Sequence, residues 1–300
     1  MANIIDNHKG IPFPQITIQE AVNQFKLEYE TAISHGKKAS KIRTSSLIKC
    51  IHNAVKMDFI NSGVHPSLIN PSKKYLQRVI NPAARKYNGR RKLKDKELQL
   101  GGFLKTKTQD ISVIPNNVSI IPQTLNLDSM MNGFSDLFGD AFTESILSVN
   151  VRSQLSSIGK NFDTLYERTF AESLNLHLRC PRMVLGEVYL IPTQEYDDDA
   201  SKNAEIDFNR IDVVKYIEAF QAINRRANDA DALYKYERCC LLVVDFEPDV
   251  PKIYNTTEEL KQDGFLPNAS TASMTGLDYT NFVADIKQIY SARFPTNTFS

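Results

Sequence analysis

Apolar residues recur at helical spacing along the first part of the chain. Over residues 17–62 they follow the three-to-four-residue period of an amphipathic helix. The stretch HPSLINPSKK, which contains Pro66 and Pro71, interrupts this period and predicts turns. A further helix is predicted over residues 73–88. The N-terminal third of the chain is therefore expected to be helical.

The pattern changes after the segment GGF at residues 101–103. LKTKTQDISVIP and NVSIIP predict two short strands joined by a turn at Asn116 and Asn117, and MMNGFSDLFGDAF predicts a short amphipathic helix. Further strands are predicted at SILSVNV, MVLGEVYLIP and CCLLVVDF, and helices at 156–178, 210–237 and 278–293. The order β-β-β-α-β-α-β predicts an α/β (α+β) fold, a mixed β-sheet flanked by helices.

The same pattern suggests three parts of the chain. We expect a helical basic region over residues 1–95 and a core over residues 96–250. A C-terminal loop and helix, over residues 251–300, are expected to pack on that core. The predicted helices at 210–237 and 278–293 are candidates for dimer or recognition surfaces.

Two of the predicted strands carry polar side chains on one face, because residues two apart in a strand point the same way. These polar faces consist of Ser148, Asn150 and Arg152 in one strand and of Thr108, Asp110 and Ser112 in the other. Carboxylates are depleted inside strands, so an aspartate that begins a β-branched run is unusual. The pattern alone leaves two interpretations open, a small charged site and a solvated face.

Composition narrows the class of protein. The chain has 300 residues, of which 42% are hydrophobic and 24% charged, as in an ordinary folded domain. No apolar run approaches the roughly 18 residues of a membrane span, and MANIIDNHKGIPFP lacks the order of a signal peptide. We therefore expect a soluble cytoplasmic protein with no membrane partner. The four cysteines lack the paired spacing of a zinc site, which predicts buried thiols.

The net charge of +1 hides an uneven distribution. Through Lys107 the chain has 20 Lys and Arg against 7 Asp and Glu, and the remainder has 16 against 28. The basic part is densest over residues 73–97, which suits contact with the phosphate backbone of DNA. A solvated basic helix face is the alternative. The candidate DNA-contacting residues are Lys73, Lys74, Arg85, Lys86, Arg90, Arg91, Lys105 and Lys107.

Three short segments resemble the PD-(D/E)xK nuclease superfamily. QDISV is similar to the strand that supplies its first aspartate, and NVRSQ looks like a variant of its E-x-K-S strand. TFAESLNL resembles the A-E-A-L-N-L type of helix in a branch of type II restriction endonucleases. In that branch the second acidic ligand has moved from the strand to the following helix. The resemblance covers about residues 95–191.

This resemblance implies a Mg²⁺-dependent, site-specific endonuclease that hydrolyses double-stranded DNA as a homodimer on a palindromic site. Mg²⁺ prefers hard oxygen ligands and lowers the pKa of a bound water. On this reading Asp110 is the first metal ligand and Glu172 the second, while Arg152 occupies the place of the usual lysine.

Asn150 departs from the family pattern, because it stands where the strand's Asp or Glu is expected. A neutral amide is a poor substitute for a carboxylate, so the helix has to supply the second ligand. The motif favours Glu172, while Glu167 is nearer in sequence and stays a candidate. Helix geometry alone does not choose between them.

Arg152 is the second departure, since arginine stays protonated and cannot act as a general base, although it can grip a phosphate. Gln154 is a candidate for orienting a water or binding neighbours of the strand. Glu97 is either an accessory metal ligand or a surface charge. Two other functions remain open: a non-catalytic DNA-binding protein on a degenerate nuclease core, and an RNA-binding or DNA-repair protein.

Overall fold

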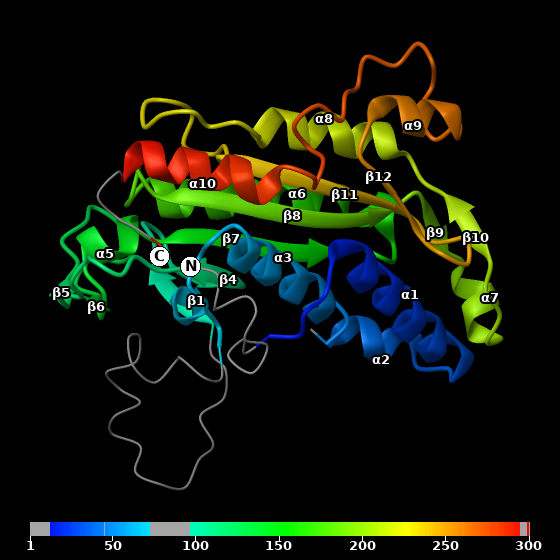
Figure 1. Cartoon of the computed structure of the whole chain (residues 1–300), viewed down its shortest axis with the longest axis horizontal. Coiled ribbons are helices and arrows are strands. Elements are labelled where there is room, and N and C mark those ends of the chain that lie inside the picture. Colours follow the sequence, from blue (N-terminus) through cyan, green and yellow to red (C-terminus); the bar gives the residue numbers. More distant parts are fainter. Residues whose placement is uncertain (1–12, 45, 73–96, 295–298, 300) are drawn as a thin grey trace, which may run out of the picture.

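A six-stranded mixed sheet forms the centre of the computed structural model, which describes residues 13–44, 46–72, 97–294 and 299 (Figure 1). Along the sheet the strands are β1 (Ile69–Asn70), β4 (Ile111–Val113), β7 (Leu147–Ser153), β8 (Val184–Pro192), β11 (Arg238–Asp245) and β12 (Lys252–Tyr254). The three central strands β7, β8 and β11 are parallel, and the outer three pair antiparallel. This sheet, with helices against it, confirms the predicted fold class.

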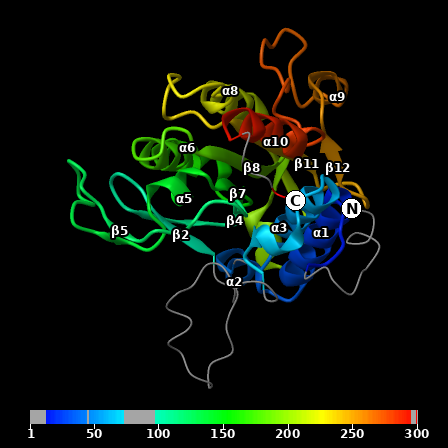
Figure 2. The ribbon, with the colours of Figure 1, turned by 60° about the vertical axis from the view of Figure 1, so that its left-hand side comes forward.

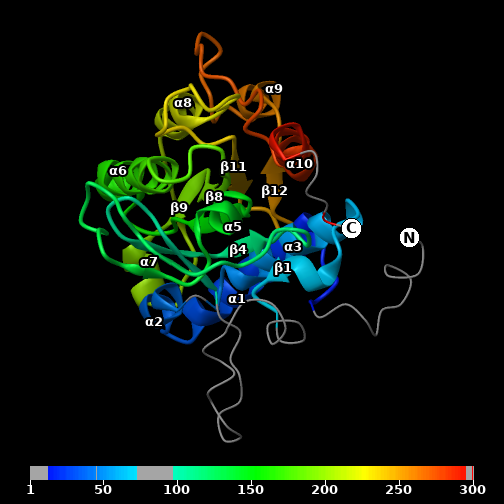
Figure 3. The ribbon, with the colours of Figure 1, turned by 90° about the vertical axis from the view of Figure 1, so that its left-hand side faces the viewer.

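Helices cover both faces of the sheet, as parallel central strands require. In Figure 3, α6 (Ile158–His177) and α8 (Val213–Ile223) lie on one side, and α3 (Lys49–Asn61) and α10 (Phe282–Arg293) on the other. The aromatic contact between Tyr189 and Phe220 joins β8 to α8. All residues of β8 and β11 are accordingly buried.

The N-terminal helices belong to the same hydrophobic core as the sheet. α1 (Ile18–Ser34) begins at a capping box formed by Thr17 and Glu20, and it buries Phe25 against Phe246 at the end of β11. α2 (Lys38–Arg43) follows, and α3 packs on α1 and α10. The described part of the N-terminal region, residues 13–44 and 46–72, is thus built into the core, and it also contributes β1 to the sheet.

Several short strands and helices lie outside the six-stranded sheet. Figure 2 shows β5 projecting on the side of the molecule away from α1 and α3. These smaller elements are the 3₁₀ helix η1 (Pro66–Leu68), the strands β2 (Leu98–Gly101), β3 (Thr106–Gln109), β5 (Gln123–Thr124), β6 (Ser135–Asp136), β9 (Gln194–Tyr196) and β10 (Phe208–Arg210), and the helices α5 (Asp140–Glu144), α7 (Asp198–Lys202) and α9 (Thr257–Gln262). The short helix predicted in MMNGFSDLFGDAF is α5, shifted to the end of that segment.

Two predicted elements are wrong. The segment 117–122 forms no strand, because β4 already lies between β1 and β7 and offers it no free edge. The helix predicted over 210–237 ends at Ile223. Asn224 there turns to extended backbone, and its side chain bonds Cys239 N and Gly276 O, both at 2.7 Å. The helix predicted over 73–88 lies outside the described residues.

The buried thiols are confirmed, since Cys50, Cys180, Cys239 and Cys240 are all buried and free of disulfides. No helix in the described part of the chain is long and apolar enough to cross a membrane.

Gly186 lies where β8 and α10 pack closely, and it provides a test of this interface. A Cβ on Gly186 would lie 2.7 Å from Ile286 Cδ1 and 3.0 Å from Phe282 Cζ. Because overpacking a core costs about 1–3 kcal/mol, we expect Gly186→Ala to lower the free energy of unfolding by that amount in urea denaturation.

Gly159 provides the matched control. It lies in α6, and a Cβ added to it would have no other side chain or distant backbone atom within 4 Å. Gly159→Ala should leave the free energy of unfolding unchanged or raise it by less than about 0.5–1 kcal/mol, the cost of glycine in the middle of a helix, because Gly159 lies in the first turn of α6. Equal effects of the two substitutions would contradict the proposed packing.

Candidate functional site

A cleft of about 900 Å³ lies where the pairing of β4 with β7 stops. The ladder between these strands ends at Val149, so β7 continues past β4 from Asn150 onward. Side chains from β3, β7, α6 and the N-terminal helices line this cleft. The cleft contains Asp110, Asn150, Arg152 and Glu172, so the structure brings these predicted site residues together.

Asp110 lies directly before β4 and faces the free edge of β7. Its Oδ2 accepts a hydrogen bond from the Val151 amide at 2.9 Å. Burial raises the pKa of the Asp110 carboxyl to about 6, although the bond from Val151 acts in the opposite direction. The Asp110 carboxyl therefore binds a proton more readily than the carboxyl of an exposed aspartate.

Glu172 reaches the same place from α6, and its side chain is only 4% exposed. Asn150 Nδ2 donates to Glu172 Oε1 at 3.1 Å, while Lys107 Nζ and Arg152 Nη2 both donate to Oε2, at 2.8 and 2.5 Å. Burial alone would raise the pKa of Glu172, but the two cations pull it below its usual range. The carboxyl is therefore ionised and fully engaged with donors.

Arg152 is held by three partners. Besides Glu172, its Nη1 donates to Thr169 Oγ1 at 3.1 Å, and its Nε lies 3.5 Å from Glu187 Oε1. Burial opposes the charged guanidinium, but Glu187 and Glu172 raise the pKa of Arg152 above its usual value. Its orientation is therefore fixed by α6 on one side and β8 on the other.

Glu187 was missed by the sequence analysis. It is fully buried in the middle of β8, and among the described residues neither of its oxygens has a hydrogen-bond partner. Burial raises the pKa of this carboxyl to about 8. The available signal was a carboxylate inside the otherwise uncharged strand MVLGEVYLIP, placed across from Asn150 in the register.

Asn175 explains why β3 meets α6 at this point. It lies one helical turn after Glu172, and its Oδ1 accepts from Leu104 N at 2.7 Å and from Lys105 N at 3.1 Å. Its Nδ2 donates to Lys105 O at 3.0 Å. The turn between β2 and β3 is thereby fixed to α6, and Lys107 is held against Glu172.

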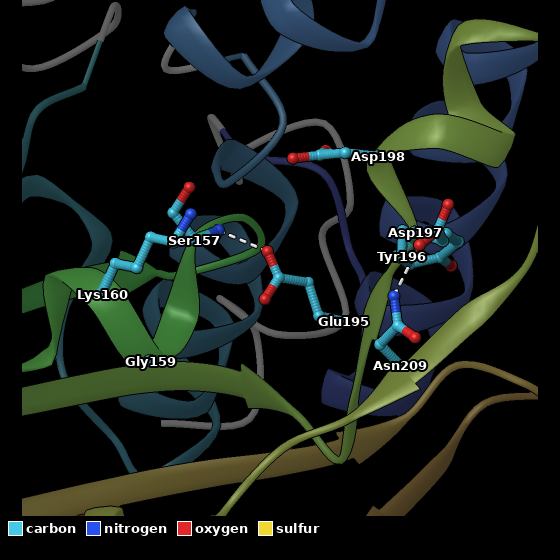
Figure 4. A pocket seen from close by; sticks show the side chains of 8 residues that line it. All are labelled: Ser157, Gly159, Lys160, Glu195, Tyr196, Asp197, Asp198 and Asn209. Atoms are coloured by element: carbon cyan, nitrogen blue, oxygen red, sulfur yellow. Dashed lines mark hydrogen bonds between the residues drawn. The ribbon is translucent and has the colours of Figure 1, made fainter.

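A second pocket, of about 410 Å³, lies at the N-terminus of α6, and a residue that lines it fixes this end of the helix (Figure 4). Its Glu195 accepts from the backbone amides of Ser157 and Ile158, which replaces the missing side-chain cap of the helix. The neighbouring carboxylates of Asp197 and Asp198 are bound by Asn209 and Lys38. The polar groups of this pocket therefore serve the fold and the placement of α6.

Two predicted site residues lie elsewhere. Glu167 is exposed on α6 and does not line the cleft, so the structure favours Glu172 as the helix carboxylate. Gln154 is buried outside the cleft and accepts from Tyr189 and Tyr216 at 3.2 and 2.8 Å, a structural role.

Other charged side chains also line the cleft. Glu97 lines it, directly before β2. Lys105 and Lys107 line it as well, together with Lys49 and Arg168, which the sequence did not indicate. The predicted DNA-contacting residues outside the described part of the chain are Lys73, Lys74, Arg85, Lys86, Arg90 and Arg91.

The donor set fits Mg²⁺ better than a metal that needs a closed protein cage. Within residues 13–44, 46–72, 97–294 and 299, no group of three His, Cys, Asp or Glu side chains is placed to hold a metal ion. Mg²⁺ is usually bound by one or two carboxylates, with waters and substrate phosphates completing its shell. Asp110 and Glu172 are two carboxylates of the cleft that could hold such an ion.

Comparison with known proteins assigns this chain to no family. No protein-family model matches the chain, and neither a curated protein nor a solved structure is significantly similar to it. The cleft and the three short sequence motifs are therefore the observations that bear on function.

The buried Glu187 carboxyl predicts a specific pH dependence of stability. Its pKa is raised from 4.5 to about 8, so its contribution is complete below about pH 4.5 and is lost as the pH rises through 8. Glu187→Gln cannot ionise. In urea unfolding between pH 5 and pH 9, wild type should lose stability relative to this variant, by at most about 1.4 kcal/mol per pH unit.

Glu167→Gln is the control, because Glu167 is exposed on the helix beside the site. Its stability should follow the wild-type pH profile. If the Glu187→Gln profile ran parallel to wild type over the same range, the buried ionisation would be ruled out.

Proposed function

We propose that the protein is a Mg²⁺-dependent endonuclease that hydrolyses phosphodiester bonds of double-stranded DNA. The observation that carries the proposal is the hydrogen bond from Asn150 to Glu172. It places a helix-borne carboxylate beside the strand amide that stands where the nuclease pattern expects an acid. Asp110 lies on the other side of the same amide, with its backbone N 3.5 Å from Asn150 Oδ1.

The chemistry follows from this pair of carboxylates. A bound Mg²⁺ would supply a water of lowered pKa and would stabilise charge on the phosphate oxygens. Asp110 and Glu172 would hold that ion. Arg152 would grip a phosphate oxygen through its planar guanidinium, and it does not act as a base.

The walls of the cleft support a polyanionic substrate. Lys49, Lys105 and Arg168 line it in addition to Lys107 and Arg152. Cations spread along a cleft bind the phosphate backbone of DNA without regard to sequence. Within this proposal the basic N-terminal segment contributes further backbone contacts.

The finer proposal is a type II restriction enzyme that cuts at a specific site as a cytoplasmic homodimer. It rests on the resemblance of QDISV, NVRSQ and TFAESLNL to that nuclease branch. A two-fold symmetric dimer matches a palindromic DNA site.

A second function, non-catalytic DNA binding, is favoured by the ion pairs of Glu172. Lys107 and Arg152 both donate to Glu172 Oε2 and Asn150 donates to Oε1, so each oxygen that a metal could use already has a donor. A core that had lost its metal would keep such internal pairs. Incubation with plasmid DNA separates the two functions: discrete Mg²⁺-dependent fragments support the restriction enzyme, and retardation without cutting supports the binding protein.

The two carboxylates provide the mutational test. We expect Asp110→Ala and Glu172→Ala to reduce Mg²⁺-dependent plasmid cleavage by at least about 100-fold. This estimate follows because even outer partners of a metal site are worth about 10- to 100-fold in metal affinity or activity. DNA binding in a gel-shift assay should survive in the Asp110→Ala protein, since the cleft keeps its cations. Because Glu172 also ties α6 to β3 and β7, Glu172→Gln, which keeps the size of the side chain, is compared with Glu172→Ala.

Glu167→Ala is the matched control on the same helix, and it should cleave at the wild-type rate because its side chain is exposed outside the cleft. Normal cleavage by the Asp110→Ala protein would show that the site is misplaced. Loss of cleavage in the Glu167 variant alone would move the metal site to the outer face of α6.

A further inference from the structure

Glu187 occupies a position that the packing of the sheet does not explain. All nine residues of β8 are buried, and Glu187 has an exposed fraction of 0%. It points to the same sheet face as Asn150, its partner in the register. Burying a carboxyl group without hydrogen-bond donors is costly, and an apolar side chain of similar volume is often more stable there.

Among the described residues, Arg152 is the one cation that forms an ion pair with Glu187. Arg152 Nε lies 3.5 Å from Glu187 Oε1, whereas its Nη2 donates to Glu172 on the opposite side. The guanidinium therefore sits between two carboxyl groups. Glu172 has three donors, while both oxygens of Glu187 are still available as acceptors.

A divalent ion at Glu172 would disturb this arrangement. The ion would compete with Arg152 and Lys107 for Oε2, and its positive charge would repel both. Lys107 reaches Glu172 from β3 as a single flexible ammonium group. Arg152, in contrast, remains bound to Thr169 and has Glu187 directly beside it.

We infer that Glu187 is a positioning residue, which holds the Arg152 guanidinium in the cleft when Glu172 coordinates the divalent ion. The inference rests on the proposed function. Glu187 does not touch the ion or the DNA; its two carboxyl oxygens, which have no donor among the described residues, accept from the Arg152 guanidinium in place of Glu172. The arginine can then release Glu172 without leaving the place where it meets the phosphate.

Mn²⁺ binding to the full-length protein, measured by EPR of the free ion without DNA, tests this role apart from catalysis. Glu187→Gln keeps the size of the side chain but replaces one acceptor oxygen by an NH2 group, which cannot accept from the guanidinium. We expect this change to weaken Mn²⁺ binding roughly 10- to 100-fold, as for other outer partners of metal sites. Glu167→Gln, on the exposed side of α6, is the control and should bind as wild type.

A double-mutant cycle with Arg152→Met separates positioning from a structural role. If Glu187 acts through Arg152, adding Glu187→Gln to the Arg152→Met protein leaves Mn²⁺ affinity unchanged. An equal loss in both backgrounds, or wild-type affinity of Glu187→Gln, would overturn the inference. Glu187→Met serves in the same cycle if the glutamine variant does not fold.

Mn²⁺ binding and DNA cleavage by the wild-type protein distinguish a failure of this inference from a failure of the proposed function. A wild-type chain that neither binds Mn²⁺ nor cuts DNA removes the proposed function, and the inference with it. If the wild-type protein binds Mn²⁺ and cuts DNA, and the Glu187→Gln variant binds Mn²⁺ equally well, only the inference about Glu187 is removed.

Discussion

The buried carboxylate of Glu172 is the interaction on which the arrangement of the site depends. It is ionised, almost completely buried, and bound by donors from β3 and β7. Removing one partner of a buried ion pair typically costs about 3–5 kcal/mol, because the remaining charge stays buried without compensation. The same carboxylate therefore fixes three elements: α6 has to face β7, and the β2–β3 hairpin has to bring Lys107 over both.

Much of this site follows from local sequence pattern. The period-two alternation of β7 placed Asn150 and Arg152 on one face, and Asp110 meets that face beside Val151. The choice between Glu167 and Glu172 was different. Both lie on one helix, and only the packing of that helix on the sheet decides which of them is buried. Sequence spacing carries no information on that packing.

The missed residues show the same limit. Lys49 and His52 line the cleft from α3, about a hundred residues away from β7 in sequence, so no local pattern connects them. The sequence pattern did not single out Glu187, because a buried parallel strand is a continuous run of apolar residues and one carboxylate within it has no periodic pattern of its own. The predicted helix at 210–237 failed for a tertiary reason too, since the side chain of Asn224 bonds the start of β11.

In the proposed function, the balance of charge in the cleft would link the binding of the ion to the binding of the substrate. Asp110 and Glu172 face Lys107 and Arg152, so these four side chains are close to neutral together when the Asp110 carboxyl is ionised. A divalent ion entering alone would add two positive charges to a partly buried site, where such charges are poorly screened. A phosphodiester supplies a compensating negative charge and gives Lys107 and Arg152 a new partner. If the proposed function holds, the binding of ion and DNA would therefore reinforce each other, because each removes the electrostatic obstacle to the other. In such a site, the cations that block Glu172 in the free protein are the groups that would receive the substrate.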